Sequence, residues 1–233
     1  MSTNANDKTE PVDFDAFANQ YDAALERGIS LSGEDKDFFA RGRVEWLARC
    51  IAGTHPERVL DYGCGTGSTS PLLQSVLRAS SVIGVDTSKA EIALAMRNAG
   101  SSLSFVTIGD FRPQEDVDIA YCNGVFHHIP LNQRAEAIEY IRDSLRPGGL
   151  FSFWENNPWN PGTRLVMSRI PFDRDAILVS AREARRLARA AGFEVLSTDF
   201  LFVFPRVLRA LRKLEARLTS LPLGAQYQVL CRK

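Results

Sequence analysis

The sequence has few cysteines, no long apolar run and no excess of charge of either sign. Its four cysteines, Cys50, Cys64, Cys122 and Cys231, are scattered over 233 residues and form no Cys-x-x-Cys pair. This spacing argues against a disulfide framework and against a zinc site, and it suits a reducing compartment. No apolar stretch approaches the ~18 residues that cross a membrane. The first residues also lack the charged-then-apolar layout of an export signal, so a cytoplasmic protein is expected.

The charges balance over the whole chain but not along it. Lys and Arg total 28, as do Asp and Glu, so the formal net charge is zero. A neutral chain without an appended basic segment argues against nucleic acid as a partner. Residues 1–37 hold nine acids and three bases, whereas residues 140–233 hold sixteen bases and eight acids. The basic part is interpreted as a solvated helix surface, with no stable membrane association but room for weak surface contact.

From residue 58 onward, short apolar segments alternate with helical patterns. This alternation favours parallel β-α-β units and a sheet covered on both faces. Ser88 and Ser180 are each followed by a glutamate three residues later, which marks two helix starts. Predicted strands cover residues 58–61, 81–86, 103–108, 117–123, 150–155, 193–204 and 226–232. Predicted helices cover residues 35–52, 68–77, 88–99, 132–145, 180–192 and 206–218. Pro147-Gly148-Gly149 is expected to stop the helix over residues 132–145.

The most informative segment is residues 59–67, which read VLDYGCGTG. A strand here runs into a loop with glycine at every second position, and glycine lets a ligand approach the backbone closely. A dinucleotide fingerprint would need a third glycine where Ser68 stands, and a phosphate loop would need a lysine. Asp61, just before the loop, suits a ligand with a cationic ammonium group. Asp86 ends the next strand, where a carboxylate can bind both hydroxyls of a ribose.

Five segments, taken in order, resemble the class I S-adenosylmethionine-dependent methyltransferases, and an N-terminal segment resembles their small-molecule branch. They are the DxGxGxG loop, Asp86, Gly109-Asp110-Phe111, residues 123–128 (NGVFHH) and residues 145–149 (LRPGG), with residues 14–22 (FDAFANQYD) resembling the lid helix. The resemblance implies a Rossmann-like α/β fold: a mostly parallel seven-stranded sheet with an antiparallel last strand, an N-terminal helical lid and a helical insertion near the C-terminus. It implies S-adenosylmethionine as cofactor and S-adenosylhomocysteine as product.

The resemblance also implies roles for the cofactor-binding residues. The glycine loop and the Asn123-Gly124 pair hold the methionine part, and Asp86 binds the ribose. Asp110 contacts the adenine amino group, while Phe111 lines the ring. The lid residue Tyr21 closes over the cofactor. The predicted cofactor-binding set is Tyr21, Asp61, Gly63, Cys64, Gly65, Gly67, Asp86, Thr87, Asp110, Phe111, Asn123 and Gly124.

Three residues are candidates for a catalytic base. His127 and His128 follow the fourth strand at the cofactor end of the sheet, and either can deprotonate a hydroxyl. The alternative is that both only shape the loop. Glu155, which ends the fifth strand, is the third candidate. No metal is expected, because no cluster of ligating residues is evident. Residues 154–161 (WENNPWNP) offer rings and amides to an acceptor, or form a rigid proline-locked loop.

The expected organisation is a disordered tail over residues 1–11 and one methyltransferase domain over residues 12–233. Within it, residues 12–53 form the lid helices, 54–155 the cofactor-binding core, and 156–233 the acceptor loop and last strands. The expected reaction is methyl transfer to an oxygen or nitrogen of a small-molecule acceptor, by a monomer or homodimer. The alternatives are a non-catalytic S-adenosylmethionine-binding protein and a methyltransferase for a lipid-linked or macromolecular acceptor. An oxidoreductase is disfavoured, because the third glycine and any Tyr-x-x-x-Lys pair are absent.

Overall fold

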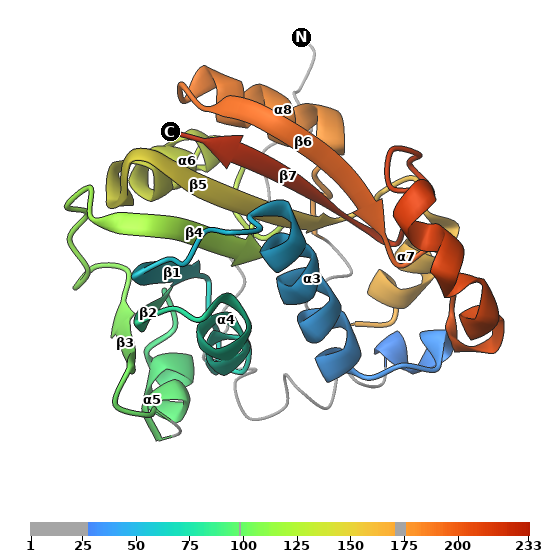
Figure 1. Cartoon of the computed structure of the whole chain (residues 1–233), viewed down its shortest axis with the longest axis horizontal. Helices are drawn as coiled ribbons and strands as arrows, with labels where there is room; N and C mark the ends of the chain where they lie inside the picture. The colour runs from blue at the N-terminus through green and yellow to red at the C-terminus, as the bar shows by residue number, and fades with distance from the viewer. Residues whose placement is uncertain (1–27, 98, 171–175) are drawn as a thin grey trace, which may run out of the picture.

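The computed structural model describes residues 28–97, 99–170 and 176–233, with a seven-stranded sheet at its centre (Figure 1). The strand order is β3-β2-β1-β4-β5-β7-β6. The strands β1 to β5 pair in parallel, and β7 is antiparallel to both of its neighbours. The predicted mixed sheet with an antiparallel last strand is therefore confirmed. The strands are β1 (Arg58–Tyr62), β2 (Ser81–Asp86), β3 (Leu103–Thr107), β4 (Val117–Asn123), β5 (Leu145–Asn156), β6 (Glu194–Leu201) and β7 (Gln226–Arg232).

Helices cover both faces of the sheet because alternate strand side chains are apolar on both sides. Val59 of β1 belongs to a buried cluster with α3 and α4, whereas its neighbour Leu60 belongs to the cluster with α6 and α8. In β4, likewise, Ile119 belongs to the cluster with α3 and α4, and Ala120 belongs to the cluster with α6 and α8. The helices are η1 (Ser30–Ser32), α3 (Lys36–Cys50), α4 (Ser70–Leu77), α5 (Lys89–Arg97), α6 (Arg134–Ser144), α7 (Pro161–Met167), α8 (Ala181–Ala190) and η2 (Arg206–Arg217).

The local signals in the sequence placed most elements correctly. The strands β2, β4 and β7 have the predicted bounds. The Oγ of Ser180 accepts the Glu183 N–H at 3.2 Å, and the Oγ of Ser88 accepts the Glu91 N–H at 3.1 Å. Both predicted helix starts are thus confirmed.

The predicted elements differ from the structure at β5, at the end of β6 and in the type of the last helix. The prediction stopped a helix at Pro147-Gly148-Gly149, but β5 already begins at Leu145. The two glycines belong to the strand because the Gly148 N–H and the Gly149 carbonyl both bond to the backbone of Lys233. The last helix, η2, is a 3-10 helix with non-helical angles at Leu208, and none of its residues is buried.

The segment after β5 also differs from its prediction. Residues 161–167 form α7, which begins at Asn160, whose Oδ1 accepts the Thr163 N–H at 3.0 Å. Trp154 is fully buried in the core beside α3 and α4, and Trp159 is 58% exposed. Residue Tyr21, the tail over residues 1–11 and the lid helix over residues 14–22 lie outside the described residues.

Candidate functional site

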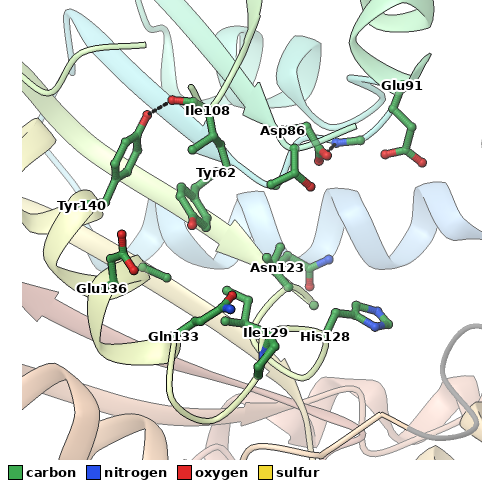
Figure 2. Close-up of a pocket in the computed structure, with 17 residues that line it drawn as sticks. Tyr62, Asp86, Glu91, Ile108, Asn123, His128, Ile129, Gln133, Glu136 and Tyr140 are labelled. Carbon is green, nitrogen blue, oxygen red and sulfur yellow. Dashed lines mark hydrogen bonds between the residues drawn. The ribbon is translucent and has the colours of Figure 1, made fainter. Parts of the chain in front are cut away.

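A cavity of roughly 360 Å³ opens at the carboxyl ends of β1, β2 and β4 (Figure 2). Parallel strands place such a crevice where the strand order reverses, here beside β1. Tyr62 and Tyr140 line one side of it, while Asn123 and His128 lie on another (Figure 2). Of the predicted cofactor residues, six line this cavity: Gly63, Gly65, Asp86, Thr87, Asn123 and Gly124.

The glycine loop wraps the cavity with backbone rather than with side chains. Gly63, Gly65 and Gly67 all have positive φ, at 72°, 53° and 74°. The Gly63 N–H donates to the carbonyl oxygen of Val85 at 2.8 Å, which ties the loop to β2. Gly67 and Cys64 do not line the cavity; they pack against Phe105 and α5. Burial raises the pKa of the Cys64 thiol, so this cysteine is protonated and inert.

Asp86 connects the loop to the next helix. Its Oδ2 accepts the Gly65 N–H at 2.9 Å, and its Oδ1 accepts the Ser88 N–H at 2.9 Å. Both oxygens are therefore oriented by backbone donors, and each retains a second lone pair for a ligand. Glu91 lies beside it at the same side of the cavity (Figure 2). Two carboxylates thus face the cavity from the end of β2 and the start of α5.

Asp61 lies beneath the glycine loop and does not line the cavity. It is buried, and its Oδ2 accepts a hydrogen bond from the Ser70 hydroxyl at 2.7 Å. Burial raises the pKa of its carboxyl from 3.8 to about 7, although the Ser70 bond and the positive charge of Arg43 act in the opposite direction. The carboxyl is therefore poised to gain a negative charge when a cation binds nearby.

The raised pKa of Asp61 predicts that the ligand-free protein loses stability as pH rises. The native state holds this proton more tightly than the unfolded chain, so the contribution is complete below pH 3.8 and lost as pH passes about 7. A shift of this size corresponds to roughly 4 kcal/mol. Asp61→Asn should flatten the decline, as measured by urea unfolding between pH 4 and 8. An unchanged pH dependence in Asp61→Asn would contradict the assignment.

The side of the cavity away from Asn123 is aromatic. The Tyr62 and Tyr140 rings lie 5.8 Å apart, and the Tyr140 hydroxyl donates to the Ile108 carbonyl oxygen at 3.2 Å (Figure 2). Asp110, predicted to contact adenine, is exposed and accepts the Thr107 hydroxyl at 2.6 Å. Phe111 is buried in the core. Neither lines the cavity, so their predicted roles stay predictions.

A second cavity, of roughly 560 Å³, adjoins the first. It is lined by α3, α7 and the segments after β6, η2 among them. Figure 1 shows α7 and η2 at one end of the sheet, where α3 begins. Asn123, Gly124 and His128 line both cavities. The end of β4 and the residues that follow it therefore form the wall between the two cavities. A group bound in one cavity can reach a group bound in the other at this wall.

His127 and Glu155 form a buried pair at this wall. The Nδ1 of His127 lies 2.7 Å from Oε2 of Glu155, and Oε1 of Glu155 accepts the Phe126 N–H at 2.8 Å. Glu155 is fully buried and lines neither cavity, whereas His127 lines the second. The carboxylate fixes the ring and favours a proton on Nδ1, so that Nε2 is the ring atom able to accept one.

The loop that carries His127 is fixed from behind by Arg134, which is 1% exposed. Its guanidinium donates to the carbonyl oxygens of Ile129 and Ile177 and pairs with Glu183 at 2.9 Å. The Ile177 N–H in turn donates to the His127 carbonyl oxygen at 3.2 Å. This network holds the residues after β4 to α6 and α8.

Several residues of the site were not predicted from the sequence. Tyr62, Glu91 and Tyr140 line the first cavity, and Arg43 lines the second. Tyr62 stands inside the glycine motif, and Glu91 was interpreted only as part of a helix start, so both had a usable signal. Tyr140 and Arg43 had none, since ordinary helix patterns surround them.

The charges of the first cavity indicate the kind of ligand that fits it. Its described lining contains three carboxylates, Asp86, Glu91 and Glu136, and no Lys or Arg. Asn123 adds a buried Oδ1 that has no hydrogen-bond partner among the described residues. Such a lining suits a cationic ligand with N–H donors and opposes a pyrophosphate. The aromatic side and the paired oxygens of Asp86 suit an adenosine, so these residues fit S-adenosylmethionine.

The described ranges, residues 28–97, 99–170 and 176–233, contain neither a group of possible metal ligands nor a helix that could span a membrane. Within them, no three His, Cys, Asp or Glu side chains gather closely enough to hold a metal ion. None of the helices in the same ranges combines the length and apolar character needed to span a membrane.

Comparison with known proteins gives matches across most of the chain. A family model described as "Methyltransferase domain" matches residues 36–198. A ubiquinone biosynthesis O-methyltransferase of Alkalilimnicola ehrlichii is 27% identical over 169 residues, covering 68% of this chain and 67% of that protein. A trans-aconitate 2-methyltransferase of Escherichia coli is 29% identical over 138 residues, covering 58% of this chain and 53% of that protein. The match thus spans about half the length of this second relative.

A solved structure from Thermotoga maritima, described as a SAM-dependent methyltransferase and possible histamine N-methyltransferase, has the same fold. It superposes with a TM-score of 0.66 at 19% identity, covering 94% of this chain and 98% of that one.

Proposed function

This chain belongs to the class I S-adenosylmethionine-dependent methyltransferases, and on that premise we propose that it methylates an oxygen or nitrogen atom of a small molecule. The observation that carries the proposal is the wall of Asn123, Gly124 and His128 shared by two cavities. One cavity is anionic and aromatic-lined, and the other is larger and mostly apolar. A cofactor and an acceptor bound in them would meet at this wall.

The first cavity is the proposed cofactor site. Asp86 would hold the ribose, since both of its oxygens are already oriented by backbone N–H groups. The Oδ1 of Asn123 would accept a hydrogen bond from the methionine ammonium, and Asp61 would supply negative charge from beneath the loop. Tyr62 and Tyr140 would lie along the adenine ring. Bound S-adenosylmethionine supplies a sulfonium methyl group that a nucleophile displaces in line.

The second cavity is the proposed acceptor site, with His127 as the base. The Glu155 carboxylate would hold the His127 ring and stabilise the imidazolium formed when Nε2 takes a proton from the acceptor. Glu155 thus becomes a positioning residue, and His128 shapes the wall. The cavity would align the nucleophile with the methyl group. The ubiquinone relative, named an O-methyltransferase, supports an oxygen nucleophile.

The proposal is tested by titrating the protein with S-adenosylmethionine and S-adenosylhomocysteine in a calorimeter, and then by following labelled methyl transfer to hydroxylated and aminated small molecules. We expect micromolar binding of both and transfer to at least one acceptor. Asp86→Ala should weaken binding by about 1–3 kcal/mol through lost charge-assisted hydrogen bonds. Asp143→Ala, which removes an exposed carboxylate, is the matched control and should bind as the parent does.

Three outcomes would count against the proposal in different ways. If neither S-adenosylmethionine nor S-adenosylhomocysteine binds, the first cavity is not a cofactor site. Binding without transfer to any acceptor would favour a non-catalytic S-adenosylmethionine-binding protein. Equal affinity of Asp86→Ala and the parent would contradict the ribose role of Asp86.

A further inference from the structure

One side chain in the larger cavity is out of keeping with its apolar surroundings. Arg43 of α3 is 7% exposed, yet it lines the cavity beside aromatic residues such as Phe38, Phe39 and Phe202. Burying a guanidinium is costly unless its charge is paired. The hydrogen-bond partners of Arg43 therefore indicate which kind of ligand the cavity can bind.

The two side chains that accept hydrogen bonds from Arg43 are neutral. Its Nε donates to the Tyr121 hydroxyl at 3.0 Å, and its Nη1 donates to Oε1 of Gln226 at 2.9 Å. Burial raises the pKa of Tyr121 to about 12, so its phenol carries no negative charge at neutral pH. No carboxylate of the described residues lies within ion-pair distance of Arg43, and Asp61 is only near enough to have its pKa lowered. The guanidinium of Arg43 is thus held in place by neutral partners, and no carboxylate of the described residues forms an ion pair with it.

The other cations that line the cavity differ from Arg43. Arg212 pairs with Glu34 at 2.9 Å and lies over the Phe38 ring at 4.5 Å. Lys36 is partly exposed. Only Arg43 among the described lining cations is both buried and without an acidic partner.

The partners of Arg43 place it over the strand ends that carry the proposed chemistry. Tyr121 is on β4, two residues before Asn123, and Gln226 pairs in register with Asn156, the residue after Glu155. The Gln226 amide also donates to Oδ1 of Asn156 at 3.1 Å. With Nε and one Nη1 hydrogen engaged, the guanidinium still has Nη2 and an Nη1 hydrogen, the planar pair that binds a carboxylate.

From this geometry we propose that the acceptor is a carboxylic acid with an apolar or aromatic body, whose carboxylate binds Arg43 inside the larger cavity. This inference rests on the proposed function and adds the chemical class of its substrate. The two cavities then differ in the charge that they favour, since three carboxylates line the cofactor side and Arg43, a buried cation without an ion pair among the described residues, lines the acceptor side. A volume of roughly 560 Å³ accommodates a one- to three-ring molecule.

The test compares acids with their neutral amides in protein saturated with S-adenosylhomocysteine. The probes are 4-hydroxybenzoate, 4-hydroxycinnamate and 6-hydroxy-2-naphthoate, each beside its amide, with affinities measured by calorimetry. We expect at least one acid to bind about tenfold or more tightly than its amide, as loss of one buried ion pair implies. Arg43→Met should reduce that preference to about twofold or less, and Arg43→Lys should retain part of it.

Two controls establish whether the Arg43 charge itself causes the preference for acids. Arg41→Met removes an exposed arginine two residues earlier on α3 and should leave the preference unchanged. Arg43→Met should still bind S-adenosylhomocysteine with micromolar affinity, which shows that the variant is folded. If no acid binds more tightly than its amide, or if Arg43→Met keeps the preference, the proposal is overturned. If S-adenosylhomocysteine itself does not bind the parent protein, the proposed function fails instead.

Discussion

His127→Gln is expected to lower kcat for methyl transfer by about 10²- to 10⁴-fold, the usual contribution of a positioned general base. The substitution leaves cofactor affinity unchanged, because His127 lines the larger cavity and not the cofactor cavity. Single-turnover transfer of a labelled methyl group measures the first quantity, and S-adenosylhomocysteine titration measures the second. The deficit should shrink as pH rises through the ionisation of the acceptor hydroxyl, since an ionised nucleophile needs no base.

Two companion variants test the assignment. Glu155→Gln keeps an oxygen for the Phe126 N–H but turns an NH2 group toward Nδ1 of His127, which favours the tautomer with its proton on Nε2. That tautomer cannot accept a proton from the acceptor, so kcat should fall by at least about tenfold. His128→Gln should instead alter cofactor affinity, because His128 lines both cavities. Equal and small effects of both histidine variants would make both residues structural.

Gly63→Ala is expected to destabilise the protein by about 2–5 kcal/mol, since left-handed backbone strain and overpacking add. Gly63 has a φ of 72°, and a Cβ there would meet Cγ2 of Val125 at 2.3 Å. Val125 belongs to the loop between Asn123 and His127, so displacing it disturbs both cavities at once. We expect urea unfolding to show the loss of stability and calorimetry to show weakened binding of S-adenosylhomocysteine.

A double-mutant cycle separates the backbone strain at residue 63 from the overpacking against Val125. Val125→Ala removes the methyl groups nearest the new Cβ, so Gly63→Ala should cost less in that background by more than about 1 kcal/mol. Gly53→Ala is the matched control, because Gly53 has a φ of 86° but nothing within 4 Å of a new Cβ. Gly53→Ala should lower the free energy of unfolding only by the backbone strain, about 1–2 kcal/mol. Strict additivity of Gly63→Ala and Val125→Ala would show that the contact with Val125 is unimportant.

Sequence signals predicted those parts of the fold that depend on neighbours in the chain. Short apolar segments gave β2 and β4 their bounds, and Ser180 marked the start of its helix through a bond to a residue three positions later. The start of α7 had an equally local signal, an asparagine cap followed by proline at Pro161, but the abundance of prolines there favoured an extended loop. The sequence therefore contained a local signal for each of these elements, but the signal at α7 was interpreted as a loop.

The site was predictable only where a motif carried it. The loop from Gly63 to Gly67 and Asp86 stood out because their spacing is unusual. Arg43 did not, since the residues that hold it lie 78 and 183 positions away in the sequence. The sequence predicts Glu155 as a candidate base, whereas in the structure its carboxylate makes two internal hydrogen bonds and lines neither cavity. Such hydrogen bonds arise from tertiary packing, which the periodicity of apolar residues in the sequence does not predict.

The position of β7 sets an order of events during translation. Among the strands of the described residues it is synthesised last, yet it lies between β5 and β6, and β6 has no other neighbour among these strands. The strands that frame the cofactor cavity, β1, β2 and β4, leave the ribosome more than 100 residues earlier. Gln226, which holds Arg43, arrives only with β7. A nascent chain can therefore assemble the cofactor half while its acceptor half is still an open edge, a surface that invites pairing with other chains.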